Sequence, residues 1–178
     1  NDSRVTVVRS LADQTALTEA FSGADAILSV MGTTSTSYDR SSLLSENMTT
    51  VEEAMSVAGV DRIIIINTMV AAPPGKPMSR IMRFFSWMPG TIGRGATEQQ
   101  AVVDALGNGH FSSLRWTIVR AGVNARGKDE PPVASLDWDG ALNSWSPVSY
   151  DAMGRWMLEE AVENEFVCKA PLVSRRRG

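Results

Sequence analysis

Cysteine and histidine are nearly absent from this sequence of 178 residues, which contains one of each, Cys168 and His110. A single cysteine excludes an internal disulfide and is typical of a reducing compartment. The same scarcity leaves almost no soft ligands for a zinc ion, so we predict no metal site. Cys168 lies in the apolar stretch FVCKAPLV, and we expect its thiol to be packed and unreactive.

Long apolar runs and a strong net charge are also missing. No segment reaches the length of a membrane span, and the first residues, NDSRVTVVRS, lack the apolar core of a signal peptide. The formal net charge of −3 gives no reason to expect a nucleic-acid partner. We therefore expect a cytoplasmic protein. Because the chain begins without Met, directly on a strand-like run, we also expect it to be N-terminally incomplete.

Strand and helix patterns alternate along the chain. The isoleucines at 63–66 are typical of a strand that is buried on both faces, as in parallel sheets. Further strands are expected at 4–8, 24–30, 115–122 and 170–174, and helices at 14–23, 43–58, 98–107 and 150–162. This alternation predicts a single α/β domain over 1–178, with a doubly wound parallel sheet covered on both faces.

Four segments carry a resemblance to a known family. They are VTVVRSLADQTALTEAFSGADAILSVMG, NMTTVEEAMSVAGVDRIIIINT, LRWTIVRAGVN and VSYDAMGRWMLEEAV. In order and spacing they resemble the atypical short-chain dehydrogenase/reductases, from the third strand of that fold to its late helix. The closest subgroup is that of the NmrA-like and biliverdin-reductase-B-like NAD(P)H-binding proteins. The resemblance implies an NAD(P)-binding Rossmann-like fold.

The sequence departs from this family at its start. The family begins with a strand, a Gly-x-x-Gly-x-x-Gly turn and a helix, then a second strand with a basic residue that contacts phosphate. None of these is present, and PGTIGRG at 89–95 does not follow a strand, so we reject it as a phosphate loop. In the family the missing strands lie between 4–8 and 24–30. If the chain folds alone, we expect these two strands to pair directly.

The resemblance implies catalytic roles for Thr68 and Asn67. The family places a Ser or Thr at the end of the fifth strand, where its hydroxyl binds the substrate carbonyl, and Thr68 falls on that position. The alternative is that Thr68 only satisfies backbone groups at a strand end. The family's Tyr-x-x-x-Lys pair is absent, and Gln99 or Gln100 lies near the lysine position. The biliverdin-reductase-like subgroup also lacks this pair.

The resemblance further implies cofactor contacts after the fourth and sixth strands of the fold. The implied cofactor is NADP or NAD, with NADP slightly favoured. The alternative for the two glycines is a simple turn, and Ala121 replaces a proline of the family. The implied cofactor-binding residues are Met31, Gly32, Thr33, Arg120, Ala121, Gly122 and Val123.

Two segments lie outside the regular pattern. Residues 76–95 combine aromatic, methionine and basic side chains, and in such folds this insertion covers the substrate pocket. That composition suits an apolar or aromatic small-molecule substrate. A membrane-surface helix and a packed surface segment are the alternatives. Residues 175–178 are expected to form a basic tail.

The function implied is therefore hydride transfer from NAD(P)H to a small organic acceptor, by an active enzyme or a remnant of one. Two alternatives stay open. One is a non-catalytic NAD(P)-sensing or protein-binding regulator like the NmrA-type members. The other is an incomplete chain that binds no dinucleotide. The sequence does not indicate an oligomeric state.

Overall fold

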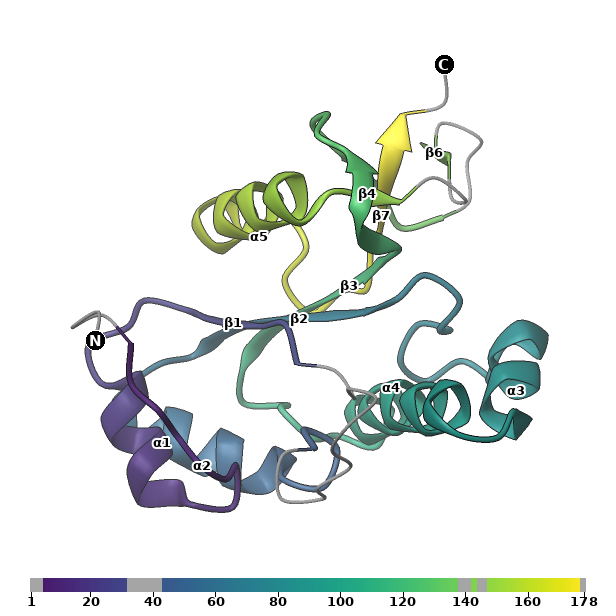
Figure 1. Ribbon diagram of the computed structural model, residues 1–178. Helices are drawn as coiled ribbons and strands as arrows, with labels where there is room; N and C mark the ends of the chain where they lie inside the picture. The colour runs from purple at the N-terminus through teal and green to yellow at the C-terminus, as the bar shows by residue number, and fades with distance from the viewer. Residues whose placement is uncertain (1–4, 32–42, 138–141, 144–146, 177–178) are drawn as a thin grey trace.

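The computed structural model describes residues 5–31, 43–137, 142–143 and 147–176. Figure 1 shows a twisted sheet with a single helix on one side and a layer of helices on the other. The predicted α/β class with a mainly parallel sheet is confirmed.

The centre of the sheet is formed by the strands β2 (Arg62–Thr68) and β3 (Arg115–Ala121). They are parallel and paired along their full length, from Arg62 opposite Arg115 to Thr68 opposite Ala121. The short strand β1 (Ile27–Ser29) lies parallel to β2 on one side, and β7 (Leu172–Arg176) lies parallel to β3 on the other. The strand order is β1-β2-β3-β7-β5.

The remaining strands surround β7. The strands β5 (Val133–Ser135) and β6 (Leu142–Asn143) both pair with it in antiparallel fashion. The strand β4 (Val123–Lys128) continues from β3 and forms bridges with Val148.

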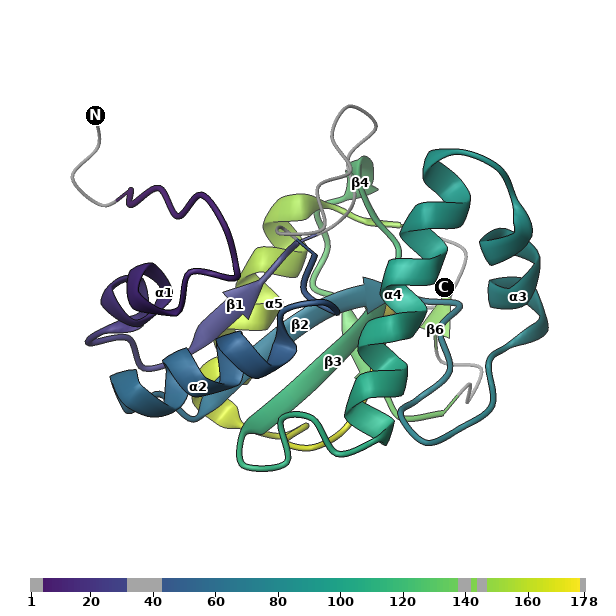
Figure 2. The same cartoon turned by 90° about the horizontal axis from the view of Figure 1, so that it is seen from below.

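Four helices lie on one face of the sheet, as Figure 2 shows from below. They are α1 (Gln14–Phe21), α2 (Met48–Ala58), α3 (Arg80–Trp87) and α4 (Thr91–Gly107). The helix α5 (Tyr150–Glu163) covers the opposite face, and α3 lies on the outer flank of α4. The predicted helices are all present, and α4 begins earlier than the sequence indicated.

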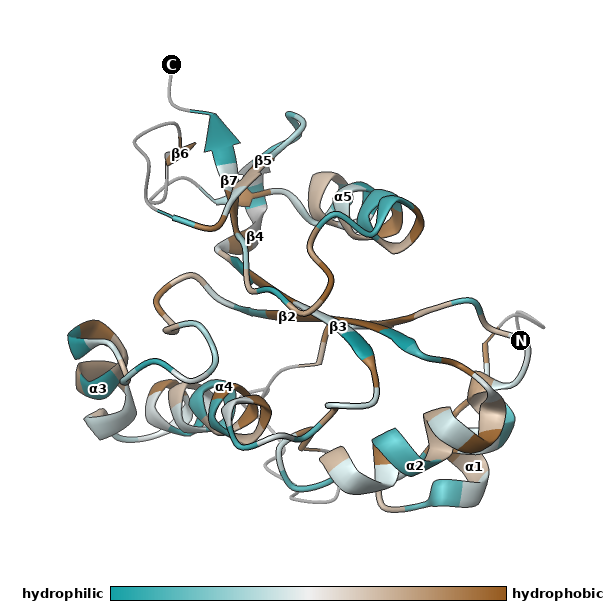
Figure 3. Ribbon diagram, turned by 180° about the vertical axis from the view of Figure 1, so that it is seen from behind, coloured by the Kyte–Doolittle hydropathy of each residue, from teal (hydrophilic) through white to brown (hydrophobic). Residues whose placement is uncertain are grey.

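The isoleucines at 63–66 pack on both faces of the sheet, because successive side chains of a strand point to opposite faces. Ile63 and Ile65 pack with Ile118 against α1, α2 and α4, whereas Ile64 packs with Val119 against α5. In Figure 3 the apolar colour follows these strands and the helix faces turned toward them. Burial of β2 on both faces, predicted from the four isoleucines, is confirmed.

Serine and aspartate caps fix where three helices begin. The side-chain oxygens of Asp13, Ser79 and Ser149 accept hydrogen bonds from backbone N–H groups in the first turns of α1, α3 and α5. The Ser79 hydroxyl also donates to the carbonyl oxygen of Val70, with an O···O distance of 2.6 Å. This bond ties the start of α3 to the loop that follows β2.

Three predictions about the chain's periphery are wrong. Residues 5–10 form no strand, and Val5 and Val7 are 68% and 80% exposed, so this segment does not pair with β1. β1 is three residues long and pairs only with β2 among the described strands. The Cys168 thiol is exposed instead of packed.

The prediction of a basic tail over residues 175–178 is wrong for residues 175 and 176. Arg175 and Arg176 belong to β7, and Arg175 pairs with Glu130 at an Nη2···Oε2 distance of 2.9 Å. Residues 177–178 lie outside the described part of the chain. No helix among the described residues is long and apolar enough to cross a membrane. In the same ranges, no group of three or more His, Cys, Asp or Glu side chains could hold a metal ion.

Candidate functional site

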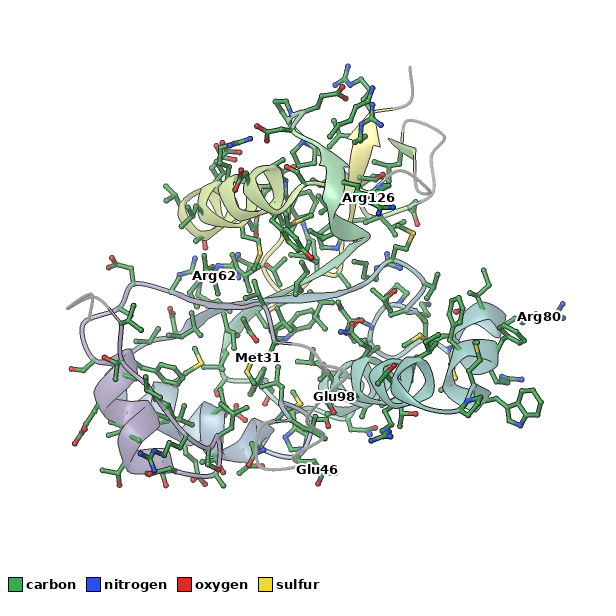
Figure 4. The ribbon with its side chains drawn as sticks, in the orientation of Figure 1. Met31, Glu46, Arg62, Arg80, Glu98 and Arg126 are labelled. Carbon is green, nitrogen blue, oxygen red and sulfur yellow. The ribbon has the colours of Figure 1, made fainter. Side chains whose placement is uncertain are left out.

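The carboxyl ends of the parallel strands bring the predicted site residues to one edge of the sheet. β2 ends at Thr68 and β3 at Ala121, and these two residues lie opposite each other in the parallel pair. β1 ends at Ser29, two residues before Met31, which is 39% exposed. Figure 4 shows Met31 on the same side of the sheet as Glu98 of α4. Gly32 and Thr33 lie outside the described residues.

Thr68 is held in place through its backbone. Its N–H donates to Oε1 of Gln99 in α4 and to Oδ1 of Asn67, each with an N···O distance of 2.7 Å. The Asn67 side-chain amide donates to the carbonyl oxygen of Gln99, with an N···O distance of 3.0 Å, and is buried. Asn67 and Gln99 together therefore fix the end of β2 against α4. The catalytic roles of Thr68 and Asn67 stay predictions.

Thr68 lines a pocket, and no described residue forms a hydrogen bond with its hydroxyl. The pocket has a volume of about 340 Å³ and lies between the end of β2 and the helices α3 and α4. No lining residue carries a titratable side chain. The lining residues are Thr68, Val70, Met82, Phe85, Thr91, Ile92, Gly95, Ala96 and Gln99.

Arg120 lines a neighbouring pocket of about 340 Å³ on the loop side of the sheet edge. Its guanidinium is buried and donates to three backbone carbonyl oxygens, of Ala170 (2.8 Å), Ala71 (3.2 Å) and Leu136 (3.4 Å). Burial lowers the pKa of Arg120 from its usual value, and nearby Asp137 opposes this in part. These bonds join β3 to the loops that follow β2 and precede β7.

The turn after β3 is tightly packed. Ala121 is buried, and Val123 is half-buried at the start of β4. A Cβ atom on Gly122 would lie 2.4 Å from the Met69 Cε, and the Gly122 carbonyl oxygen accepts from the Val148 N–H at 2.9 Å. A side chain at position 122 would therefore displace Met69. The roles of these residues toward a cofactor stay predictions.

Sequence reasoning missed Glu98, which is buried beside the site. One carboxylate oxygen accepts from the Ser45 N–H at 3.1 Å, and the other accepts from the Ser45 hydroxyl. This contact joins α4 to the segment before α2. The two residues are far apart in the chain, and neither belongs to a recognisable motif, so no sequence signal pointed to the pair.

Comparison with known proteins supports the family assignment. The family model for NAD(P)H-binding proteins matches residues 1–161. No curated protein matches the chain. Among solved structures, one similar to this chain is a short-chain dehydrogenase/reductase from Veillonella parvula in complex with NADP. It has a TM-score of 0.63 and 17% identity, over 98% of this chain and 74% of that one.

Two further structures are similar to this chain. An oxidoreductase from Lactococcus lactis has a TM-score of 0.64 and 14% identity, over 95% of this chain and 70% of that one. A Rossmann-fold NAD(P)-binding family protein from Shigella flexneri has a TM-score of 0.55 and 15% identity, over 95% of this chain and 69% of that one. At these identities the likeness shows the fold. Together with the family match, it shows that this chain belongs to the NAD(P)H-binding family of Rossmann-fold proteins.

Proposed function

We propose that this protein is an NAD(P)H-dependent oxidoreductase that transfers a hydride to a small organic acceptor, with NADP as the favoured cofactor. The observation that carries the proposal is the position of Thr68. It lines a pocket at the carboxyl end of the central strand, and no described residue forms a hydrogen bond with its hydroxyl. In α/β sheets of this kind, ligands bind outside the carboxyl ends of the strands.

The proposal assigns residues at this edge to parts of the dinucleotide. Thr68 and the turn at Gly122, at the ends of β2 and β3, would contact the nicotinamide, and Met31, after β1, would contact the adenine ribose. The glycine-rich turn that receives a pyrophosphate is not among these 178 residues. A bound nicotinamide supplies the hydride. The chain's own residues orient the acceptor beside it.

Thr68 is the residue that we propose to orient the acceptor. Its hydroxyl can donate to a carbonyl oxygen and stabilise the negative charge that grows there as hydride arrives. The Gln99 side-chain oxygen accepts from the Thr68 N–H, which leaves its amide group as a second donor in the same pocket. Because no titratable side chain lines the pocket, the proton that completes the reduction comes from water.

The lining also favours a class of acceptor. Apolar side chains make up most of the lining beside Thr68 and Gln99, namely Val70, Met82, Phe85, Ile92 and Ala96. Such a pocket favours a flat, apolar or aromatic acceptor with one polar oxygen. A volume of about 340 Å³ is at the small end of the usual range for ligand sites.

A non-catalytic NAD(P)-sensing regulator is the second candidate. The lack of a titratable group in the pocket favours it, since many enzymes of this fold hold a proton donor there. The two candidates share cofactor binding and differ in turnover. A regulator would bind NAD(P)H without oxidising it in the presence of any acceptor.

Titration of NADPH and NADH, followed by nicotinamide fluorescence, tests the proposal. Saturable binding, with oxidation of NADPH once aromatic carbonyl or quinone acceptors are added, is the expected result. Binding without oxidation across such a panel would favour the regulator. Absence of binding for both nucleotides would contradict both candidates and would favour a chain that holds no dinucleotide.

A further inference from the structure

The helix α3 has two different faces. Its inner face carries Met82, which is fully buried, and the half-buried Phe85, and both line the pocket beside Thr68. The outer face carries apolar side chains in water: Ile81, Phe84 and Trp87 are 45%, 59% and 83% exposed. Large apolar side chains gathered on one exposed surface are unusual for a protein in water and indicate an interaction site.

Positive charge accompanies these apolar side chains. Arg80 and Arg83 are exposed between them, and neither forms an ion pair with a described residue. Figure 4 shows Arg80 pointing away from the molecule. Residues 76–94 contain four basic residues and no acidic one, in a chain whose net charge is −3. We call the surface formed by Arg80, Ile81, Arg83, Phe84 and Trp87 the α3 outer face.

We propose that the α3 outer face binds the surface of an anionic lipid bilayer. Tryptophan and phenylalanine favour the boundary between lipid headgroups and acyl chains, and arginines beside them attract anionic headgroups. The rest of the chain is acidic on balance and is repelled by such a surface. The charge distribution therefore selects α3 as the side that approaches the membrane. Contact is peripheral, because α3 has only eight residues.

The position of α3 suits this contact. It lies at the outer flank of α4, at the periphery of the helical layer and away from α5 (Figures 1 and 2). A flat surface can reach it without touching the sheet. Figure 3 shows apolar and polar colours side by side around this helix, as expected for a helix that lies in the plane of a membrane interface.

Co-sedimentation of the protein with lipid vesicles tests the proposal. One set of vesicles contains phosphatidylcholine alone, and the other contains phosphatidylcholine with phosphatidylglycerol. We expect binding to the second set and little to the first, and we expect binding to fall as salt is raised. Arg80→Glu and Arg83→Glu should each weaken binding by about five-fold or more, because a basic residue near an anionic surface contributes about that factor.

Matched variants distinguish binding through the α3 outer face from nonspecific hydrophobic adsorption to the vesicles. Phe84→Ser with Trp87→Ser should abolish binding, whereas Leu158→Ser with Val162→Ser should not change it. Leu158 and Val162 are also exposed, at 59% and 81%, but lie on α5 beside acidic residues. Lys128→Glu in β4 makes the same change of charge away from the α3 outer face, and it should leave vesicle binding unchanged. Circular dichroism of each variant checks that the fold is retained.

Several outcomes would overturn the proposal. Absence of binding to anionic vesicles would do so, as would binding that the α3 variants leave unchanged. Equal binding to both sets of vesicles would contradict the role of the arginines. If the protein instead self-associates through this surface, sedimentation velocity would show a dimer that Trp87→Ser dissociates, and the membrane proposal would be wrong.

Discussion

At the scale of single residues, Thr68 uses its backbone and its side chain differently. Its N–H is bound by Gln99, which fixes where the residue lies. Its hydroxyl forms no hydrogen bond with a described residue, and Thr68 lines the pocket between α3 and α4. A strand-ending threonine that only satisfied loop backbone would turn its hydroxyl to a carbonyl nearby. The arrangement therefore favours a role toward a ligand.

Replacing Thr68 by valine tests this role. Valine keeps the shape and removes the hydroxyl, so the rate of NADPH oxidation by a carbonyl acceptor should fall by about 100-fold, as for loss of a donor to a developing negative charge. Thr68→Ser should retain most of the activity. The measurement is steady-state kinetics of each variant, with the free energy of unfolding as a control. Equal activity of the valine variant would contradict the role.

The sequence predicted part of this site. The order of strands was enough to place Thr68 and Asn67 at the carboxyl edge, because a buried strand that stops at polar residues indicates its own end. It could not show that Gln99 would bind the Thr68 N–H, since that contact depends on how α4 packs against β2. Nor could it show that three carbonyl oxygens would bind Arg120.

At the scale of elements, the junction between α3 and α4 depends on Gly93. This residue lies in the first turn of α4, where a Cβ atom would be 1.9 Å from the Met88 carbonyl oxygen. That oxygen belongs to the backbone and cannot move without shifting the end of α3. The close approach of the two helices therefore requires glycine at position 93.

Gly93→Ala should destabilise the protein by roughly 1–3 kcal/mol, the usual cost of forcing a methyl group into a packed site. Gly154→Ala is the matched control, since Gly154 lies on the exposed side of α5 with nothing within 4 Å of its missing Cβ atom. Alanine there should stabilise the protein by roughly 0.5–1 kcal/mol through its helix propensity. Urea unfolding measures both. Similar effects at the two positions would contradict the packing argument.

The elements differ in how well the sequence predicted them. The strands β2 and β3 and the helix α5 have strong local signals, namely β-branched runs and the Ser149 cap. The strands β4 and β5 were missed because their residues have no apolar alternation, and pairing with distant partners defines them. The strand predicted at 4–8 does not form over the described residues 5–8, because a β-branched run becomes a strand only when it pairs with another strand.

At the scale of the whole molecule, a buried ion pair joins the sheet to α5. Arg62 of β2 and Glu160 of α5 are 2.7 Å apart between Nη2 and Oε1, and both side chains are 2% exposed. The same Glu160 oxygen accepts from the Thr117 hydroxyl and from the Phe166 N–H. Burial lowers the pKa of Arg62, and the Glu160 charge opposes this shift. The pair lies at the start of β2, at the edge opposite the pocket.

Because this network connects two layers, its loss should affect the stability of the whole fold. Glu160→Leu should lower the free energy of unfolding by roughly 3–5 kcal/mol, since it leaves a buried arginine charge without a partner. Arg62→Met should lower the free energy of unfolding by a similar amount, because it leaves the buried Glu160 carboxylate without its cationic partner. The double variant Arg62→Met with Glu160→Leu should cost far less than the two single costs combined, because no buried charge remains. Urea unfolding of all four proteins gives the coupling energy. Additive costs would mean that each side chain acts through packing alone. A large coupling with unchanged NADPH affinity would show that the network serves the fold and not the pocket.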